Sequence, residues 1–171
     1  MDIGTAKPTP AERAAAPHHL IDVVDPDEEF SLAVYQDLAA AAIADITGRG
    51  RLPLLVGGTG QYLAAVLEGW QIPRVAPQPE LRADLERVAA EHGPAALHDR
   101  LELVDPTAAD GILPTNVRRV IRALEVYQVT GQPISQQQVK RPPHYRARAL
   151  WLTLPADALY RRIDERVDGM V

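Results

Sequence analysis

A glycine-rich turn with a single hydroxyl stands between an apolar run and an amphipathic run in LLVGGTGQYLAAVLEG, the stretch from Leu54 to Gly69. Glycines let the backbone approach a ligand closely, and Thr59 would stand at the start of a helix, whose positive end favours anions. The turn does not fit a Walker A loop, G-x-x-x-x-G-K-[ST], because it has neither that spacing nor the lysine. Since glycines also follow strands as plain turn residues, a binding turn and a structural corner both stay open.

Basic residues are concentrated in one part of the chain. From Asn116 to Arg148, seven of them accompany a single acidic residue, Glu125, so this segment carries +6 and the remainder of the chain carries −11, for a total of −5. On a helix, the apolar positions of this segment share one face, and Arg118, Arg119 and Arg122 fall nearly opposite. Because guanidinium forks match phosphate geometry, these arginines form either a solvated helix face or a surface that binds an anion.

Other catalytic and metal-binding patterns are weak. The five histidines lack the carboxylate or His-x-x-x-His context of a metal site, and cysteine is absent. No Ser/His/Asp signature stands out, and paired carboxylates occur mostly where helix N-termini favour negative charge. We therefore expect no metal site in this chain.

The composition is that of an ordinary globular domain, with 46% hydrophobic and 24% charged residues among 171. No apolar run approaches the roughly 20 residues that span a bilayer, so we expect no membrane role. A net charge of −5 argues against a nonspecific nucleic-acid binder. The lack of cysteine and of a secretory signal pattern predicts a cytoplasmic location.

Helices must position most of these residues. Apolar periodicity and end signals predict helices over 30–48, 61–69, 79–93, 94–105, 115–131 and 156–171. Acidic residues precede the first helix, and Gly48, Gly93 and Gly131 suit helix ends. A Thr-Asn pair at 115–116 predicts the N-terminal cap of the arginine-bearing helix.

Three short apolar runs are typical of strands: LIDVV at 20–24, RLPLLV at 51–56, which we expect to be buried, and ALWLTL at 149–154. The order helix, strand, glycine turn, helix indicates an α/β fold. We expect the elements of the segment from 72 to about 139 to be helices, joined by a proline-rich crossing and polar stretches. We therefore predict a partial α/β core over 1–71, a helical insertion over 72–143 and a return to the core over 144–171.

Five phrases occur in an order and spacing that resemble the tRNA dimethylallyltransferase (tRNA isopentenyltransferase) family: MDIGTAKP, APHHLIDVVDPDEEFS, LPLLVGGTGQYLAAVLEG, ALHDRLELVDPTAA and RRVIRALEVYQVTGQPIS. The resemblance covers nearly the whole chain. It implies a P-loop NTPase-like, nucleotide-binding α/β core with a helical insertion, in a monomeric enzyme. It also implies that N6 of adenosine 37, in the tRNA anticodon loop, attacks C1 of dimethylallyl diphosphate, with Mg²⁺ assisting the departure of diphosphate.

The same resemblance assigns roles to residues of this sequence. Thr59 matches a family position beside the reacting adenosine and is therefore the catalytic candidate. The resemblance also implies that this adenosine is flipped out of its stack, as chemistry on a base usually requires. The positions that match tRNA contacts are Arg82, Arg118, Arg119, Val120, Ile121 and Arg122. Weaker candidates, next to the family's catalytic loop or in the glycine turn, are Asp2, Thr5, Lys7, Gly57 and Gly58.

Two family motifs do not occur in the 171 residues: the Walker-type GPTASGKT loop that holds diphosphate and magnesium, and an Asp-Ser motif that supplies the proposed base. A later Gly-Tyr-Arg element is also absent. We therefore expect this chain to be a fragment that is inactive alone, because it lacks the electrostatic support of the leaving group. We also expect an unpaired sheet edge.

Two other functions stay open at this point. The chain could be a tRNA-binding remnant without catalytic activity. It could also belong to the related enzymes that prenylate free adenine nucleotides to make cytokinins. The helical insertion and its arginines disfavour the second alternative, because a free nucleotide has no long phosphate backbone to contact.

Overall fold

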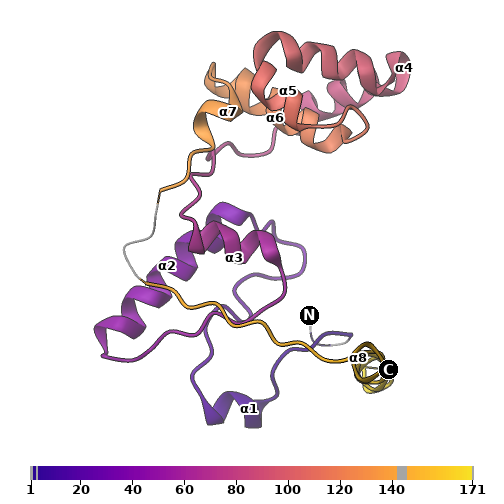
Figure 1. The fold of residues 1–171 in the computed structure, drawn as a ribbon. Coiled ribbons are helices and arrows are strands. Elements are labelled where there is room, and N and C mark those ends of the chain that lie inside the picture. Colours follow the sequence, from indigo (N-terminus) through magenta and orange to yellow (C-terminus); the bar gives the residue numbers. More distant parts are fainter. Residues whose placement is uncertain (1, 3, 142–145, 171) are drawn as a thin grey trace. The chain divides into compact units, whose positions relative to one another are not determined.

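The computed structural model describes residues 2, 4–141 and 146–170. The described residues form eight helices and no strand (Figure 1). They divide into two compact units, Met1–Gly58 with His144–Val171, and Thr59–Pro143. In the described part of the chain, no helix combines the length and the apolar character needed to cross a membrane.

The first unit contains α1 (Pro10–Ala15), α2 (Leu32–Gly48) and α8 (Ala156–Asp168). The predicted helices 30–48 and 156–171 are confirmed, and Ser31 caps α2 by accepting a hydrogen bond from the Val34 N–H at 3.2 Å. Helix α1 was not predicted. Thr9 and Glu12 form a capping box at its start, which is a local signal readable from the sequence.

The second unit, which we call the helical unit (Thr59–Pro143), contains five helices among its described residues. These are α3 (Gly60–Leu67), α4 (Pro79–Val104), α5 (Pro106–Gly111), α6 (Val117–Thr130) and α7 (Ile134–Gln137). The helices predicted over 79–93 and 94–105 follow each other within α4 and are broken at Gly93, whose φ is 84°. Asn116 caps α6 and Gly131 ends it in the left-handed region, as predicted.

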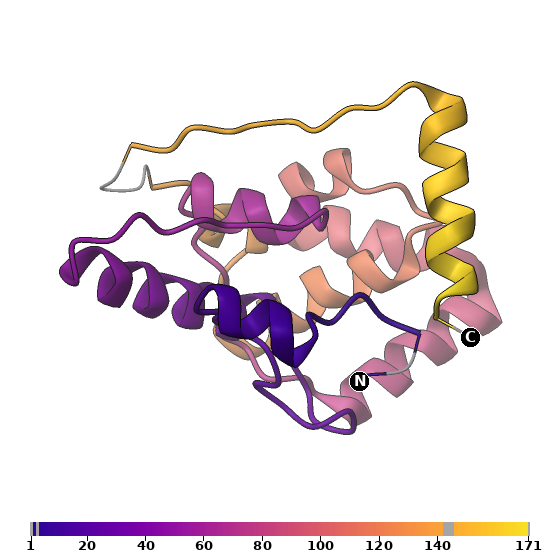
Figure 2. The same ribbon diagram turned by 90° about the horizontal axis from the view of Figure 1, so that it is seen from below.

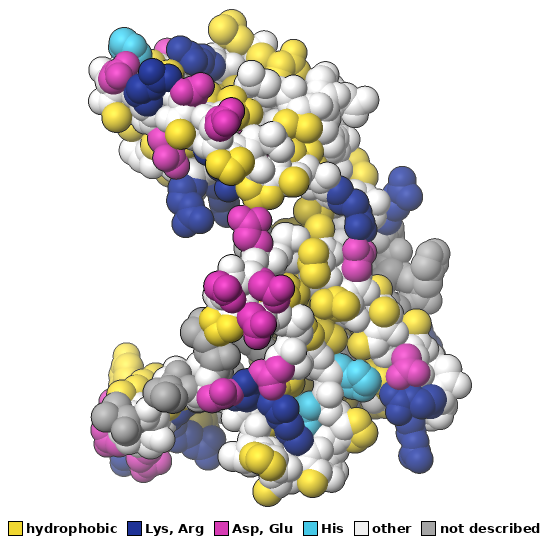
Figure 3. All heavy atoms as spheres, turned by 180° about the vertical axis from the view of Figure 1, so that it is seen from behind, with side chains coloured by type: hydrophobic (Ala, Val, Ile, Leu, Met, Phe, Trp, Pro, Cys, Tyr) yellow, Lys and Arg dark blue, Asp and Glu magenta, His cyan; other side chains and the backbone are white. Residues whose placement is uncertain are grey.

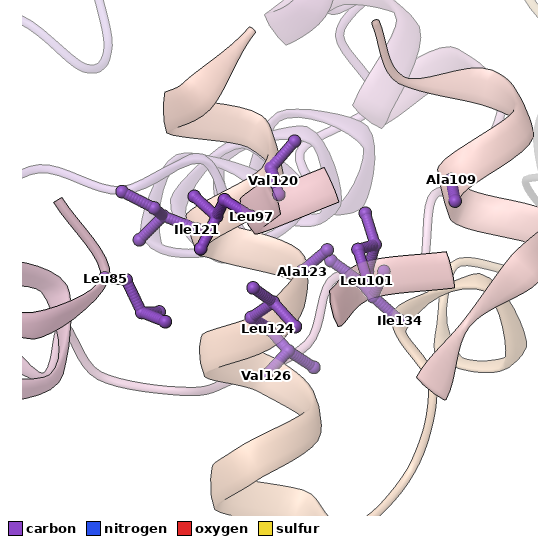
Figure 4. Packing of buried hydrophobic residues seen from close by; sticks show 10 residues of the cluster. All are labelled: Leu85, Leu97, Leu101, Ala109, Val120, Ile121, Ala123, Leu124, Val126 and Ile134. Atoms are coloured by element: carbon purple, nitrogen blue, oxygen red, sulfur yellow. The ribbon is translucent and has the colours of Figure 1, made fainter. Parts of the chain in front are cut away.

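The core of the helical unit lies where α6 packs on α4, with α5 and α7 closing its side (Figures 1 and 2). Figure 4 shows its buried side chains pointing toward one another. They are Leu85, Leu97, Leu101, Ala109, Val120, Ile121, Ala123, Leu124, Val126 and Ile134. This apolar contact fixes α6 and therefore the direction of its polar side chains.

The described residues form none of the three predicted strands. Leu20 and Asp22 have positive φ values of 59° and 55°, which break the first run. The runs 51–56 and 149–154 form no ladder, and the run expected to be buried exposes Leu52, Leu54 and Val56 by 82%, 79% and 89%. A strand takes its hydrogen bonds from a neighbouring strand, and no described segment supplies one. Hydrophobic side chains accordingly reach the surface seen in Figure 3. The α/β class is therefore not confirmed.

Two chain segments of the helical unit, 69–71 and 139–141, pair through backbone hydrogen bonds. The Gln71 N–H donates to the Val139 carbonyl at 2.8 Å, and the Arg141 N–H donates to the Gly69 carbonyl at 2.9 Å. Glu68 accepts a hydrogen bond from the Trp70 indole at 2.8 Å and forms an ion pair with Lys140. This pairing of 69–71 with 139–141 ties the chain segment that enters the helical unit to the segment that leaves it.

Candidate functional site

Thr59 lies at the start of α3, where the sequence placed it. Its backbone carbonyl accepts hydrogen bonds from the Tyr62 and Leu63 N–H groups at 3.0 and 3.2 Å. Its side chain is exposed and makes no capping hydrogen bond. The hydroxyl is therefore available at a helix N-terminus, where partial positive charge favours an electron-rich ligand group.

The glycines of this turn are not required by the turn itself. Gly57 and Gly58 have no φ in the left-handed region, and a Cβ added to either would meet no atom within 4 Å. Glycine carries an entropic cost in a folded chain, and here neither backbone conformation nor packing offsets that cost. Open space on the glycine backbone is what a closely approaching ligand needs, so the binding-turn interpretation is compatible with this geometry.

A buried carboxylate organises the arginines of the helical unit. Glu125 of α6 is fully buried and accepts hydrogen bonds from Arg82 Nε at 2.7 Å, Arg82 Nη2 at 2.9 Å and Arg122 Nη1 at 2.6 Å. The Gln78 N–H donates a further bond at 2.8 Å. We call Glu125, Arg82, Arg122 and the Gln78 N–H the Glu125 cluster. Charged donors of this kind make strong hydrogen bonds.

The electrostatics of this cluster favour an ionised carboxylate. Burial by itself raises the pKa of Glu125, because it removes water from the charged form. The hydrogen bonds from Arg82, the Gln78 N–H and Arg122 outweigh burial and lower the pKa of Glu125 from 4.5 to about 2. Glu125 is therefore charged at neutral pH and leaves the cluster with one net positive charge.

One expectation about the arginine-bearing helix is wrong. Arg122 does not point away from the core with Arg118 and Arg119. Its guanidinium turns back to Glu125 and also donates to the Val75 carbonyl at 3.0 Å and the Pro73 carbonyl at 3.3 Å. The helical projection missed this because it treats an acidic residue as solvated, whereas Glu125 lies in the core.

The five consecutive tRNA-contact candidates of α6 thus fall into three groups. Val120 and Ile121 have buried side chains within the core, so these side chains can support a site but cannot reach a ligand. Arg122 belongs to the Glu125 cluster. Arg118 and Arg119 are exposed and, within the described ranges, have no ion-pair partner. They stand in the first turn of α6, which holds no acidic residue.

The weaker candidates near the start of the chain are brought together by a turn at Gly4. Lys7 forms ion pairs with Asp2 and with Asp22, and the Thr5 hydroxyl donates to the Asp2 carbonyl at 3.3 Å. The hydrogen bond from Lys7 lowers the pKa of Asp2, and the same partner together with Arg13 lowers the pKa of Asp22. Asp22 was not a sequence candidate, because nothing local links it to Lys7.

No group of three or more histidine or acidic side chains among the described residues could hold a metal ion. The partly buried His98 donates through Nε2 to the carbonyls of Ala109 at 3.0 Å and Ile112 at 2.9 Å, so it serves the packing of α4 on α5. The described residues therefore contain no cluster of side chains that could by itself hold the Mg²⁺ implied by the resemblance.

A second buried carboxylate was also missed. Asp105 is almost fully buried, caps α5 through the Ala108 N–H at 3.0 Å, and accepts bonds from the Ser135 N–H and hydroxyl at 2.9 and 2.6 Å. Burial raises the pKa of Asp105, and the hydrogen bonds led by Ser135 lower it further than burial raises it. The capping role is readable from Asp105 followed by Pro106 at the first position of α5, whereas the bond to Ser135 is not.

Comparisons with known proteins cover the whole chain. A family model described as IPP transferase matches residues 1–171. A tRNA dimethylallyltransferase of Roseiflexus sp. (strain RS-1) is 71% identical over 171 residues, which make up 100% of this chain and 56% of that protein. One from Chloroflexus aurantiacus (strain ATCC 29366 / DSM 635 / J-10-fl) is 67% identical and is covered to 58%. The chain thus spans about half the length of these curated relatives.

Solved structures agree with these matches. The full-length tRNA isopentenylpyrophosphate transferase of Bacillus halodurans is 47% identical, with a TM-score of 0.56 over 99% of this chain and 52% of that one. A eukaryotic dimethylallyltransferase acting on tRNA is 30% identical, with a TM-score of 0.74 over 95% of this chain and 40% of that one.

Proposed function

Because the chain belongs to the IPP transferase family, we propose that it is part of a tRNA dimethylallyltransferase. The match of the family to every residue of the chain carries this proposal. In the proposed reaction, N6 of adenosine 37 in the anticodon loop attacks C1 of dimethylallyl diphosphate. An N–C bond forms, the C1–O bond breaks, its electron pair leaves with diphosphate, and N6 gives up one proton to a base.

The role proposed for Thr59 is to hold the reacting adenosine. Its exposed hydroxyl makes no capping bond to α3, so it can donate to, or accept from, the edge of a flipped base. The two glycines before it let that base approach the backbone closely. Thr59 therefore orients the nucleophile rather than taking its proton.

The role proposed for Arg118 and Arg119 is to contact the phosphate backbone of the tRNA. Two cations in the first turn of a helix are disfavoured by the helix dipole, and no acidic residue of that turn offsets this cost. An RNA phosphate relieves it, because the positive helix end and both guanidiniums then attract the same anion. Such contacts position the RNA without reading its sequence.

The remaining machinery is proposed to lie outside the 171 residues. We propose that the exposed runs 51–56 and 149–154 become strands of a P-loop-type α/β core in the whole enzyme. We propose further that this enzyme is monomeric and cytoplasmic. That core would supply the diphosphate loop, the magnesium and the base. The 171-residue chain alone then binds RNA but transfers no dimethylallyl group, because stabilisation of the leaving group is usually the largest catalytic contribution.

Binding of an anticodon stem-loop tests the proposal. We expect the purified chain to bind a stem-loop with adenosine 37 more tightly than one with another base there, and Thr59→Val to reduce this preference about tenfold, as expected for one lost hydrogen bond. Thr107→Val, at an exposed threonine of α5, is the matched control on the helical unit. Equal affinity of the wild-type chain for both stem-loops would contradict the assigned adenosine site.

A further inference from the structure

The helical unit holds two kinds of arginine. Arg118 and Arg119 are exposed and have no ion-pair partner among the described residues. Arg82 and Arg122 have side chains that are only 37% and 33% exposed, and both are bonded to the fully buried Glu125. A resemblance between sequences cannot separate the two kinds, because it compares residue types and not their partners.

The contacts of Arg122 use most of its guanidinium for the protein itself. Nη1 donates to Glu125 Oε2 at 2.6 Å and to the Val75 carbonyl at 3.0 Å, and Nη2 donates to the Pro73 carbonyl at 3.3 Å. Arg122 therefore ties α6 to the extended segment that leads into α4. A lysine could not replace it, since its single ammonium lacks the planar fork that reaches three acceptors.

Arg82 ties the first turn of α4 to the same carboxylate. Its Nε and Nη2 donate to the two oxygens of Glu125 at 2.7 and 2.9 Å, which is the bidentate geometry of a strong arginine-carboxylate pair. The Gln78 N–H, at the cap of α4, adds a bond at 2.8 Å. The Glu125 cluster thus joins the start of α4 to α6, and through Arg122 it also holds the segment 73–75.

Arg118 and Arg119 lie one turn before Arg122 on α6, so the direction of their side chains depends on how α6 is held. We propose that Glu125 is a positioning residue for RNA binding: through Arg82 and Arg122 it fixes α6 so that Arg118 and Arg119 meet phosphate, and neither Arg82 nor Arg122 contacts RNA directly. This inference rests on the proposed function.

The dependence of stem-loop affinity on salt separates positioning from contact. Each phosphate contact contributes about 0.7 to 0.9 to the slope of log K against log salt concentration. We expect Arg118→Gln to lower the magnitude of the slope by about that amount. We expect Arg82→Gln, Arg122→Gln and Glu125→Gln to weaken binding by the wild-type chain about tenfold, the effect of one misplaced charge-assisted contact. In a chain that already carries Arg118→Gln and Arg119→Gln, we expect the same three substitutions to leave the remaining affinity and slope unchanged.

Arg122→Lys sharpens the test. It keeps the positive charge but loses the fork, so a positioning role predicts that it weakens binding as much as Arg122→Gln does. For Glu125→Gln, the matched control is Glu102→Gln, which removes a negative charge from an exposed residue of α4. Affinities are measured at a temperature where circular dichroism shows each variant to be folded. If Arg122→Gln does not fold, Arg122→Lys takes its place in the comparison.

Three results would overturn the inference. A further loss of slope with Arg122→Gln or Arg82→Gln in the chain that carries Arg118→Gln and Arg119→Gln would make that arginine a phosphate contact. Near wild-type affinity of Arg122→Lys would show the same. Wild-type affinity of folded Glu125→Gln would leave the cluster with a purely structural role. In all three cases the wild-type chain still binds the stem-loop, whereas failure of the wild-type chain to bind would instead overturn the proposed function and the inference with it.

Discussion

Single residues decide what the arginine segment can do. The sequence predicted the cap Asn116 and the end Gly131 of α6, because both signals are local. It did not predict that Arg122 turns inward, since its carbonyl partners Pro73 and Val75 lie 49 and 47 positions away in the chain. Helical periodicity gives the face of a residue but not its distant partner.

The first residue-scale prediction concerns the pH dependence of stability. The pKa of Glu125 is lowered from 4.5 to about 2 in the folded chain, so its ionised form stabilises the fold above pH 4.5, and this contribution is lost as the pH falls from about 4.5 to about 2. Glu125→Gln removes the contribution. We expect the variant to be about 3 kcal/mol less stable at pH 7 and the difference to shrink toward pH 2.

Urea unfolding of the wild-type chain and of Glu125→Gln between pH 7 and pH 2 measures this difference, with Glu102→Gln as the exposed control. A difference in unfolding free energy that stays constant over this range would show that the ionisation of Glu125 does not stabilise the fold.

At the scale of elements, local signals predicted the longer helices, missed the short helices α1, α5 and α7, and were insufficient for strands. Ser31, Gly48 and Gly93 mark helix boundaries by their own chemistry, so these boundaries are predictable. The runs 51–56 and 149–154 have the composition of strands, but a strand exists only when another strand completes its hydrogen bonds. The sequence predicts that such a run prefers the extended conformation of a strand, but it does not predict whether a neighbouring strand is present to pair with it.

The pairing of segment 69–71 with segment 139–141 in the helical unit gives the prediction at this scale. Gly69 has a φ of 62°, and a Cβ added there would overlap the Arg141 carbonyl oxygen. We expect Gly69→Ala to break the pairing of 69–71 with 139–141 and to cost about 1–3 kcal/mol from the backbone conformation alone. Hydrogen exchange of the Gln71 and Arg141 amides measures the effect.

Gly111→Ala is the control for this substitution, because a Cβ there meets no atom within 4 Å. Unchanged protection of both amides in Gly69→Ala would mean that the pairing does not depend on a close backbone approach.

For the molecule as a whole, exposed apolar side chains are the most informative feature. Leu52 and Leu152 are 82% and 100% exposed, and such residues on extended segments favour association with other chains. We expect Leu52→Lys combined with Leu152→Lys to raise the concentration at which the chain remains monodisperse. The free energy of unfolding should change by no more than about 0.5 kcal/mol, because exposed side chains contribute little.

Light scattering and urea unfolding of the double variant check the two parts of this prediction, with Leu97→Lys in the core as the destabilised reference. A loss of stability in the double variant similar to that of the reference would show that Leu52 and Leu152 are buried in solution.

The central claim is that α6 presents Arg118 and Arg119 to the phosphates of a tRNA anticodon stem-loop. The most direct measurement is the salt dependence of stem-loop binding by the wild-type chain, by Arg118→Gln with Arg119→Gln, and by Arg87→Gln with Arg100→Gln, which removes equal charge from α4. We predict that only the first pair lowers the magnitude of the slope, by about 1.4 to 1.8 for two contacts. Equal slopes for both pairs would contradict the claim.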